Sequence, residues 1–324
     1  MGFNNIGDKG CTALSSAILS TSRIGGKLHT LYLAGNCIGE EGAKALAQVV
    51  RCGSGLKRIH LTGNSIGPNG IKELMSAVID YEGRVSKSSN HVSSNEMNDS
   101  SSGSNVVSTD GVSELYLGGT NMGHAGCVAV AKMLEQSTSL KVLSLSNCEL
   151  NDRDAIILAS AITQNCKRLP IEKIQLSFNN LTCKGIEALM NAVWGLSKLN
   201  DLQLDNNRMN TRGAQVVSAV LGAVKTLTTL NVGFNAISGS GIKVLMKAVA
   251  ESKTLTSLTI SGNAIDFSSS NAVAIALAHN KSLTSIFLDH CSIPSEGQRL
   301  ITAGIVSNSN TRLQLLTGFH IGCK

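Results

Sequence analysis

Two hydrophobic patterns alternate along the chain. In the first, apolar and polar residues alternate every second position, as around Leu31 and Leu33, which is typical of a strand with one face in a core. In the second, apolar residues recur at i, i+3, i+4 and i+7, as over residues 71–78, 186–193 and 242–249, which is typical of one face of a helix. We therefore expect short strands that alternate with amphipathic helices, which is the α/β class.

The two patterns together form a repeat of 28 residues. Aligned on a Leu-x-x-Leu-x-Leu segment, Leu28 has its next equivalent at Leu56 (56 − 28 = 28), and this spacing recurs with two disturbances. Full repeats start at residues 28, 56, 112, 140, 171, 199, 227, 255 and 283. A strand, a turn and a helix of this length cannot bury both faces alone, so the repeats must stack on one another. The prediction is a single solenoid over residues 1–324.

Both ends of the chain fall inside a repeat. Half a repeat, without its strand, covers residues 2–27, and a partial repeat without its helix covers residues 313–324. Terminal units of solenoids normally have a polar outer face, and neither end shows one. We expect either that the natural chain is longer or that a partner caps the ends.

One interval of 56 residues, between the repeats that start at 56 and 112, is twice the period. Its second half, residues 83–111, is rich in Ser and Asn and has no Leu to fill the buried positions of a strand. Such a composition cannot bury enough apolar surface to offset the entropy of ordering, so we predict a disordered insertion. It is either a tolerated surface loop or a regulatory loop that is phosphorylated.

The repeats resemble the leucine-rich repeats of the ribonuclease-inhibitor-like class, which follow the pattern LxxLxLxxNxIgxxGaxxLaxaL. The asparagine of that pattern stands at Asn36, Asn64, Asn179, Asn207, Asn235 and Asn263, and it is replaced by Thr120, Cys148 and Cys291. Such side chains can bond backbone groups that are exposed where the chain leaves the strand. Asp154 and Ser269 replace the glycine near the helix start, which predicts altered turns there. The resemblance implies a horseshoe solenoid with parallel strands on a concave face and helices on a convex face.

Composition narrows the class of protein. No apolar run reaches about 18 residues, and the first residues lack the pattern of a signal peptide, so we expect no membrane span. Nine cysteines without a CxxC pair favour free thiols in a reducing compartment, which predicts a cytoplasmic protein, with the nucleus as the alternative. The net charge of +6 comes from scattered residues and is weak evidence for nucleic acid, which we do not expect as a partner.

No motif of a catalytic, cofactor or metal site is visible. The sequence has no Walker loop, no GxSxG, no HExxH and no metal-spaced group of Cys and His, so we predict no enzyme, no catalytic residue, no cofactor and no metal. His60 and His290 are isolated in the sequence and are expected to be solvated. The cysteines at 11, 127, 148 and 291 occupy repeat positions that predict packing in the core.

The exposed side of the strands is the variable part of the repeat. Five of the ten aromatic residues, Tyr32, Tyr116, Phe178, Phe234 and Phe287, fall on it or at the strand exits, and aromatic residues are enriched at interface anchors. Three strand positions per repeat carry two basic and four acidic residues, a charge of 2 − 4 = −2. The residues that we expect to bind a partner through this concave face are Tyr32, Arg58, His60, Glu114, Tyr116, Lys173, Gln175, Phe178, Asp201, Gln203, Asp205, Asn231, Phe234, Phe287 and Asp289.

The sequence thus predicts a scaffold without enzymatic activity that binds another protein. The resemblance leaves two alternatives, because this repeat class also includes GTPase-activating proteins for Ran and the sensor portions of NOD-like receptors. A Ran-type activator is disfavoured by the absence of an acidic tail, and ribonuclease inhibition by the modest cysteine content and the positive net charge.

Overall fold

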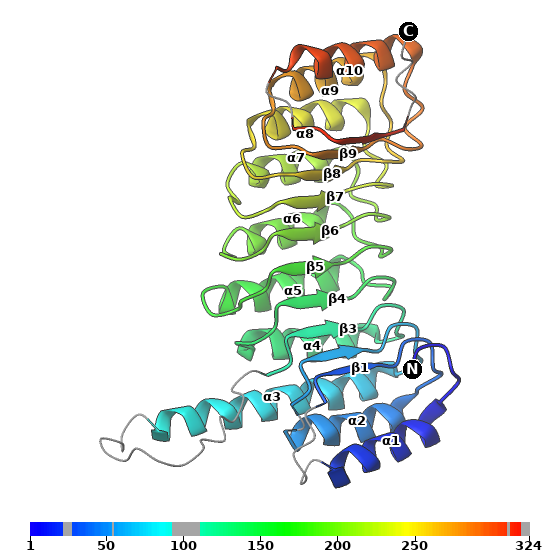
Figure 1. The fold of residues 1–324 in the computed structure, drawn as a ribbon, viewed down its shortest axis with the longest axis vertical. Coiled ribbons are helices and arrows are strands. Elements are labelled where there is room, and N and C mark those ends of the chain that lie inside the picture. Colours follow the sequence, from blue (N-terminus) through cyan, green and yellow to red (C-terminus); the bar gives the residue numbers. More distant parts are fainter. Residues whose placement is uncertain (22–27, 54, 93–110, 310–311, 319–324) are drawn as a thin grey trace. The chain divides into compact units, whose positions relative to one another are not determined.

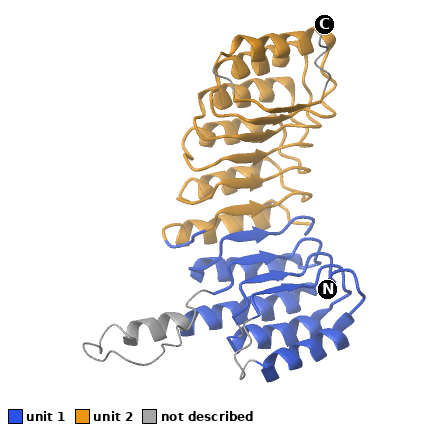
Figure 2. Ribbon diagram, in the orientation of Figure 1, with its two compact units in different colours: residues 1–148, 168–170 blue, residues 149–167, 171–324 orange. Residues whose placement is uncertain are grey.

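The computed structural model describes residues 1–21, 28–53, 55–92, 111–309 and 312–318. For residues 85–92 it describes the backbone alone. The chain divides into two compact units (Figure 2). Unit 1 comprises residues 1–148 and 168–170, and unit 2 comprises residues 149–167 and 171–324. The division falls within the repeat that starts at residue 140, which is also the repeat with an irregular length of 31 residues (171 − 140 = 31).

Unit 1 alternates helices with very short parallel strands (Figure 1). Its elements are α1 (Gly7–Thr21), β1 (Thr30–Tyr32), α2 (Glu40–Arg51), β2 (Arg58–His60), α3 (Gly67–Val92), β3 (Glu114–Tyr116), α4 (Gly123–Gln136) and β4 (Val142–Ser144). The strands pair in chain order, β1 with β2, β2 with β3 and β3 with β4, and always in parallel. Parallel pairing needs a crossover connection, and the helix of each repeat supplies it.

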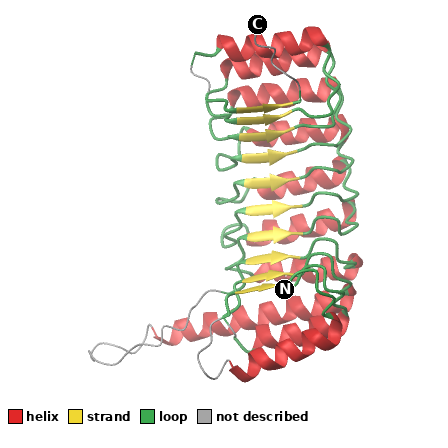
Figure 3. Cartoon of the chain, turned by 45° about the vertical axis from the view of Figure 1, so that its right-hand side comes forward, coloured by secondary structure: helices red, strands yellow, loops and turns green. Residues whose placement is uncertain are grey.

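Unit 2 continues the same alternation. Its elements are α5 (Asp152–Asn165), β5 (Lys173–Gln175), α6 (Cys183–Val193), β6 (Asp201–Gln203), α7 (Asn210–Leu221), β7 (Thr229–Asn231), α8 (Gly239–Glu251), β8 (Ser257–Thr259), α9 (Phe267–His279), β9 (Ser285–Phe287), α10 (Ser295–Ser307) and β10 (Leu315–Thr317). The six strands again pair in parallel and in chain order. In each unit the strands lie on one side and the helices on the other (Figure 3), which confirms the predicted α/β solenoid of stacked repeats.

The core of each unit lies between the strands and the helices. The central residue of each three-residue strand points into it, as Leu115 and Leu202 do, and both are buried. The apolar stripe of each helix closes the core from the other side, as Leu74 and Met75 do in α3. The periods of two and 3.6 residues in the sequence therefore correspond to the two walls of one hydrophobic layer.

Buried asparagines join successive repeats. The side chain of Asn64 accepts hydrogen bonds from the backbone N–H of Asn36 and Ile38, both at 3.0 Å, and donates to the carbonyls of Leu33 and Leu61, both at 2.8 Å. One amide thus satisfies four backbone groups in the turn after the strand, where sheet hydrogen bonds have ended. This confirms the role predicted for the asparagine position.

The residues that replace this asparagine make weaker bonds. The thiol of Cys148 donates to the carbonyl of Leu117 at 3.3 Å, and the thiol of Cys291 donates to the carbonyl of Ile260 at 3.5 Å. A thiol has no second donor and is a weak acceptor, so it cannot reproduce the four bonds of an amide.

The helices that lack the usual glycine have side-chain caps at their start. In α5, Asn151 accepts from the backbone of Asp154, and the Asp154 carboxylate accepts in return from the Asn151 N–H, which is a capping box. In α9, Asp266 accepts from the Ser269 N–H at 2.7 Å. These caps are the altered turns that the sequence predicts at Asp154 and Ser269.

Helix α3 is longer than the repeat predicts. It extends to Val92, so residues 83–92, which the composition assigns to a disordered loop, are helical. A helix needs only a local hydrogen-bond ladder, so it can continue beyond the last buried turn without a core of its own. The rest of the insertion, residues 93–110, lies outside the described residues.

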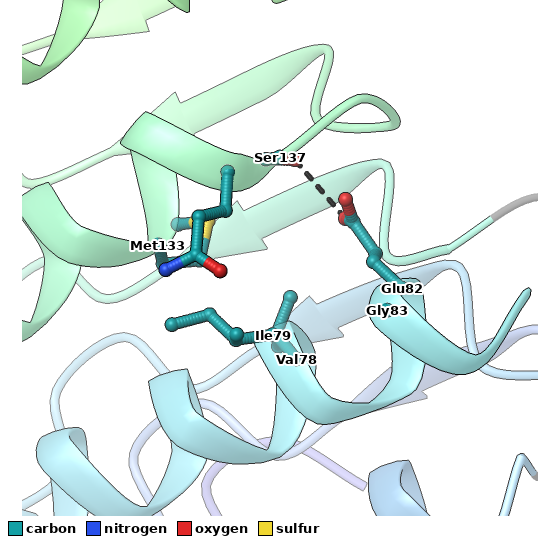
Figure 4. Close-up of a pocket in the computed structure, with 7 residues that line it drawn as sticks. Val78, Ile79, Glu82, Gly83, Met133 and Ser137 are labelled. Carbon is teal, nitrogen blue, oxygen red and sulfur yellow. Dashed lines mark hydrogen bonds between the residues drawn. The ribbon is translucent and has the colours of Figure 1, made fainter. Parts of the chain in front are cut away.

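Glu82 joins α3 to the chain that returns from the insertion (Figure 4). Its buried carboxylate accepts from the Ser137 hydroxyl at 3.0 Å, the Thr138 N–H at 2.8 Å and the Ser139 hydroxyl at 2.5 Å. Ser139 also donates to the carbonyl of Val112 at 2.9 Å, where the next repeat begins. The two ends of the insertion therefore meet at one carboxylate, and the repeat stacking resumes in register.

Candidate protein-binding face

We define the strand face of each unit as the outward side chains of its strands together with the strand-exit residues. The strand-exit residues are the two that follow the last buried leucine, isoleucine or valine of each strand segment, such as Asp205 and Asn206 after Leu204. The three-residue strands alternate as predicted: Leu31 is 6% exposed, whereas Tyr32 beside it is 55% exposed. The predicted binding residues within the strands all occupy outward positions.

Three rings of unit 1 stack on one another. The ring centroids of Tyr32 and His60 are 3.9 Å apart with planes 15° from parallel, and those of His60 and Tyr116 are 4.0 Å apart with planes 10° from parallel. The sheet pairs these three residues across β1, β2 and β3. Adjacent strands lie about 4.8 Å apart, so planar side chains at the same register can lie face to face.

An ion pair borders this stack. The guanidinium of Arg58 lies 2.7 Å from the Glu114 carboxylate, and the hydroxyl of Tyr116 donates to the same carboxylate at 3.2 Å. Burial, followed by the charge of Glu114, raises the pKa of Tyr116 to about 12. The charges of this part of the face are therefore paired with each other.

His60 is half-buried and its ring is covered on both faces, so its environment is not the solvated surface expected from the sequence. Its ring lies between two tyrosines, and its Nε2 atom is buried without a hydrogen-bond partner among the described residues. Burial is the main cause of its lowered pKa, with Arg58 acting in the same direction and Glu114 opposing. His290, in contrast, is exposed as predicted.

Polar contacts cover the strands β5 to β7 of unit 2. Lys173 pairs with Asp201 at 2.7 Å, and Asp201 also accepts from the Gln203 side chain at 2.5 Å. Asp205, one residue beyond the buried Leu204, accepts from Ser177 at 2.5 Å, from Asn206 at 2.8 Å and from Asn231 at 2.9 Å. Gln175 lies half-buried on the same strands.

The strand exits of unit 2 have two exposed phenylalanines in an unusual backbone conformation. Phe178 has φ 56° and Phe234 has φ 52°, and their side chains are 57% and 45% exposed. Equivalent positions in other repeats hold glycine, as at Gly35 and Gly63, asparagine, as at Asn206, or the histidine His290. A left-handed backbone costs a residue with a side chain about 1–2 kcal/mol, and the tolerant residues are Gly, Asn and Asp.

Phe234 also contacts its neighbours. A Cβ atom on Gly262 would lie 2.2 Å from the Phe234 ring, so the ring covers the glycine of the next strand exit. The rings of Phe234 and His290 are 6.0 Å apart. Farther along, Phe287 is half-buried on β9, and Asp289 accepts a hydrogen bond from Thr317.

The cysteines at 11, 127, 148 and 291 are buried, as predicted. Burial raises the pKa of the Cys11 thiol to about 11 and raises those of Cys148 and Cys291. Within the described ranges, no three His, Cys, Asp or Glu side chains gather into a metal site, and no helix has the length and apolar character to cross a membrane.

Within each unit these side chains lie on the outward side of the strands, as predicted, but their contacts with one another were not predicted. The stacked rings occupy the same position in successive repeats, so the alignment contained a signal for the stack. The left-handed backbone of Phe178 and Phe234 also had a signal, because both stand where other repeats have glycine.

Comparisons with known proteins agree with this architecture. A family model described as Leucine Rich repeat matches residues 1–15, 27–47, 56–75, 136–159 and 225–246. No curated protein matches the chain in sequence. Three solved structures show the range of similarity.

A chain in the crystal structure of the Rad7 and Elc1 complex in yeast is 13% identical, with a TM-score of 0.52, over 87% of this chain and 68% of that one. An internalin from Listeria monocytogenes is 15% identical, with a TM-score of 0.39, over 95% of both chains. The actin-binding site 2 of leiomodin-1 is 20% identical, with a TM-score of 0.38, over 46% of this chain and 86% of that one. At these identities the first similarity supports the fold alone, and the other two carry no weight. From the repeat pattern, the matched segments and the fold, we conclude that this chain is built of leucine-rich repeats.

Proposed function

We propose that the chain is a scaffold without enzymatic activity that binds another protein through its strand face. The main support comes from Phe178 and Phe234. Both rings are exposed, so burial does not offset the cost of their left-handed backbone. Strained residues of this kind cluster at functional sites, and exposed aromatic residues are enriched in protein interfaces.

Charge supports the unit 2 part of this face as the main contact surface. Among the residues that the structure describes, neither Asp205 nor Asp289 has an ion pair, whereas Arg58, Glu114, Lys173 and Asp201 are paired. Three neighbouring side chains hold the Asp205 carboxylate in place by hydrogen bonds, so little side-chain entropy remains to be lost on binding.

Two further parts of the proposal are the class of the repeat and the location of the protein in the cell. A full helix in a 28-residue repeat supports the ribonuclease-inhibitor-like class of leucine-rich repeats. The described cysteines are all free thiols, which supports a cytoplasmic location.

The proposal is tested with a variant that replaces both rings, F178G/F234G, in the full chain. Glycine suits the left-handed backbone, so the fold is expected to remain intact. Tagged chains are used to capture proteins from a cell extract, and the captured proteins are quantified by mass spectrometry. We expect at least one protein to bind the wild type and to fall by about tenfold or more with the variant, since interface anchors contribute more than 1 kcal/mol each.

The matched control removes two exposed rings that lie outside the strand face. Trp194 at the end of α6 and Phe267 at the start of α9 are 64% and 54% exposed, and W194A/F267A should capture the same proteins as the wild type. Identical capture by the wild type and F178G/F234G would contradict the proposal.

A further inference from the structure

The helix side of unit 1 has an open groove between α3 and α4 that the strand face does not involve. Its volume is about 540 Å³, within the range of ligand sites in proteins. Met75 and Ile79 of α3 and Val128 of α4 line its apolar part. Ile79 also lines a smaller space of about 70 Å³ that reaches Glu82 and Ser137 (Figure 4), so the two spaces follow one after the other along the same helix pair.

The groove exists because α4 has small apolar residues where other helices have long charged ones. Ala125 and Val128 stand one residue before and two residues after the helix glycine, Gly126. The corresponding residues are Glu41 and Lys44 in α2, and Lys184 and Glu187 in α6. An outward helix face that loses its charged side chains at these two positions becomes an apolar surface.

Basic side chains border this apolar surface along its length. Lys72 of α3 and both His124 and Lys132 of α4 line the groove. Lys72 and Lys132 are exposed, and in the part of the chain that the structure describes neither has an ion pair. Lys72 and Lys132 therefore give the rim positive charge that no described residue pairs.

The positions of these residues along the helices indicate the shape of the ligand. A Cβ on Gly123 would contact Pro68, and one on Gly126 would contact Ile71, so α4 is level with α3 at an offset of 55 residues (123 − 68 = 55). His124, Lys72 and Lys132 then follow one another over eight residues, or about 12 Å of helix, from alternating sides of the groove.

Because the basic residues are spread along the groove, they do not suit a ligand with one charged end, which would need them gathered at one point. They suit a ligand whose negative charges flank a continuous apolar stripe. We propose that the α3–α4 groove binds an acidic amphipathic helix of a partner protein, with its apolar stripe on Ile79, Ala125 and Val128 and its carboxylates beside Lys72 and Lys132. This is the binding of a helix in a groove, with the specificity provided by charge.

The test uses the full chain and two fluorescein-labelled peptides of about 16 residues, or roughly four to five helical turns. Both peptides have leucines at i, i+3, i+4 and i+7, and the flanking residues are Glu in one and Lys in the other. Fluorescence anisotropy should show that the wild type binds the Glu peptide more tightly than the Lys peptide. The double charge reversal K72E/K132E should weaken the Glu peptide by about tenfold or more and strengthen the Lys peptide.

The control K184E/K243E makes the same charge change at exposed residues on the helix side of unit 2 and should leave the binding of both peptides unchanged. A second variant, A125R, places a long side chain over the groove at an exposed position and should also weaken the Glu peptide. Circular dichroism establishes that each variant is folded.

The proposal is overturned if the Glu peptide does not bind, if both peptides bind equally, or if K72E/K132E leaves the Glu peptide unaffected. Vesicles of phosphatidylcholine with phosphatidylserine provide the alternative ligand. Binding of these vesicles that K72E/K132E abolishes, without binding of the Glu peptide, would assign the groove to a membrane surface and would also overturn the proposal.

Discussion

The strand faces of the two units have the same backbone frame and opposite chemistry. In unit 1, rings stand in three successive strands at one register, so they stack and cover one another. In unit 2, Phe178 and Phe234 are two repeats apart (234 − 178 = 56), so each ring remains exposed. Aromatic side chains at equivalent positions of adjacent parallel strands contact and cover each other, whereas those separated by a repeat remain exposed to a partner. The difference supports our proposal that the stack of unit 1 is mainly structural and that unit 2 provides the main contact surface.

The largest expected effect is the loss of stability on truncating a core leucine. This loss should be the same in both units, because their cores are equivalent. Leu115→Ala in unit 1 and Leu202→Ala in unit 2 each remove a fully buried side chain, and each should lower the free energy of unfolding by about 2–5 kcal/mol. Urea denaturation followed by circular dichroism measures both. A loss below about 1 kcal/mol in only one unit would show that the cores are not equivalent.

Tyr116→Ala should distinguish the role of the unit 1 strand face from that of the unit 2 strand face. It removes a ring that stacks on His60 and a hydroxyl that bonds Glu114, so we expect a loss of stability of about 1–2 kcal/mol. Capture of the partner should be nearly unaffected. Unchanged stability together with lost capture would move the contact surface to unit 1.

Phe178→Gly should have the reverse profile. Relief of the left-handed strain, about 1–2 kcal/mol, offsets the added flexibility of glycine in the unfolded chain, about 0.5–1 kcal/mol, and the loss of partial ring contacts. The free energy of unfolding should stay within about 1 kcal/mol of the wild type while capture falls. Phe178→Ala retains the strain and should be the less stable of the two variants in the same urea titration.

The smallest effect should be a pH dependence specific to unit 1. The pKa of His60 is lowered in the folded state, so the unfolded state binds more protons between that pKa and about 6.5. The contribution of His60 is complete above about 6.5 and is lost as the pH falls through this window. His60→Phe keeps a ring in the stack and should flatten the decrease in stability between about pH 7 and pH 5. The same slope in the wild type and the variant would show that another group is responsible.

The periodicity of the sequence was sufficient for the fold. The second and third leucines of LxxLxL alternate as in a strand with one buried face, and the i, i+3, i+4, i+7 stripe matches a helix packed on that strand. The buried asparagines and the two replaced glycines were predictable for the same reason, since each repeat position meets the same backbone groups in every unit.

Features that depend on contacts between repeats were harder to predict from the sequence. The sequence placed His60 on a solvated surface because a lone histidine in one repeat shows no partner, although its partners were Tyr32 and Tyr116 at the same position of neighbouring repeats. The continuation of α3 to Val92 was missed because helix formation is local, whereas the argument from composition concerned the burial of a core.

By itself, then, the sequence determined the repeat, the strand and helix walls of the core, and the residues that share the outward face. Only the tertiary structure decided which of these residues neutralise one another, as Arg58 and Glu114 do, and which remain exposed, as Phe178 does. It also revealed the groove between α3 and α4. The physical reason is that periodicity fixes the direction of a side chain from its own backbone, whereas burial, pairing and open space depend on what the adjacent repeat places beside it.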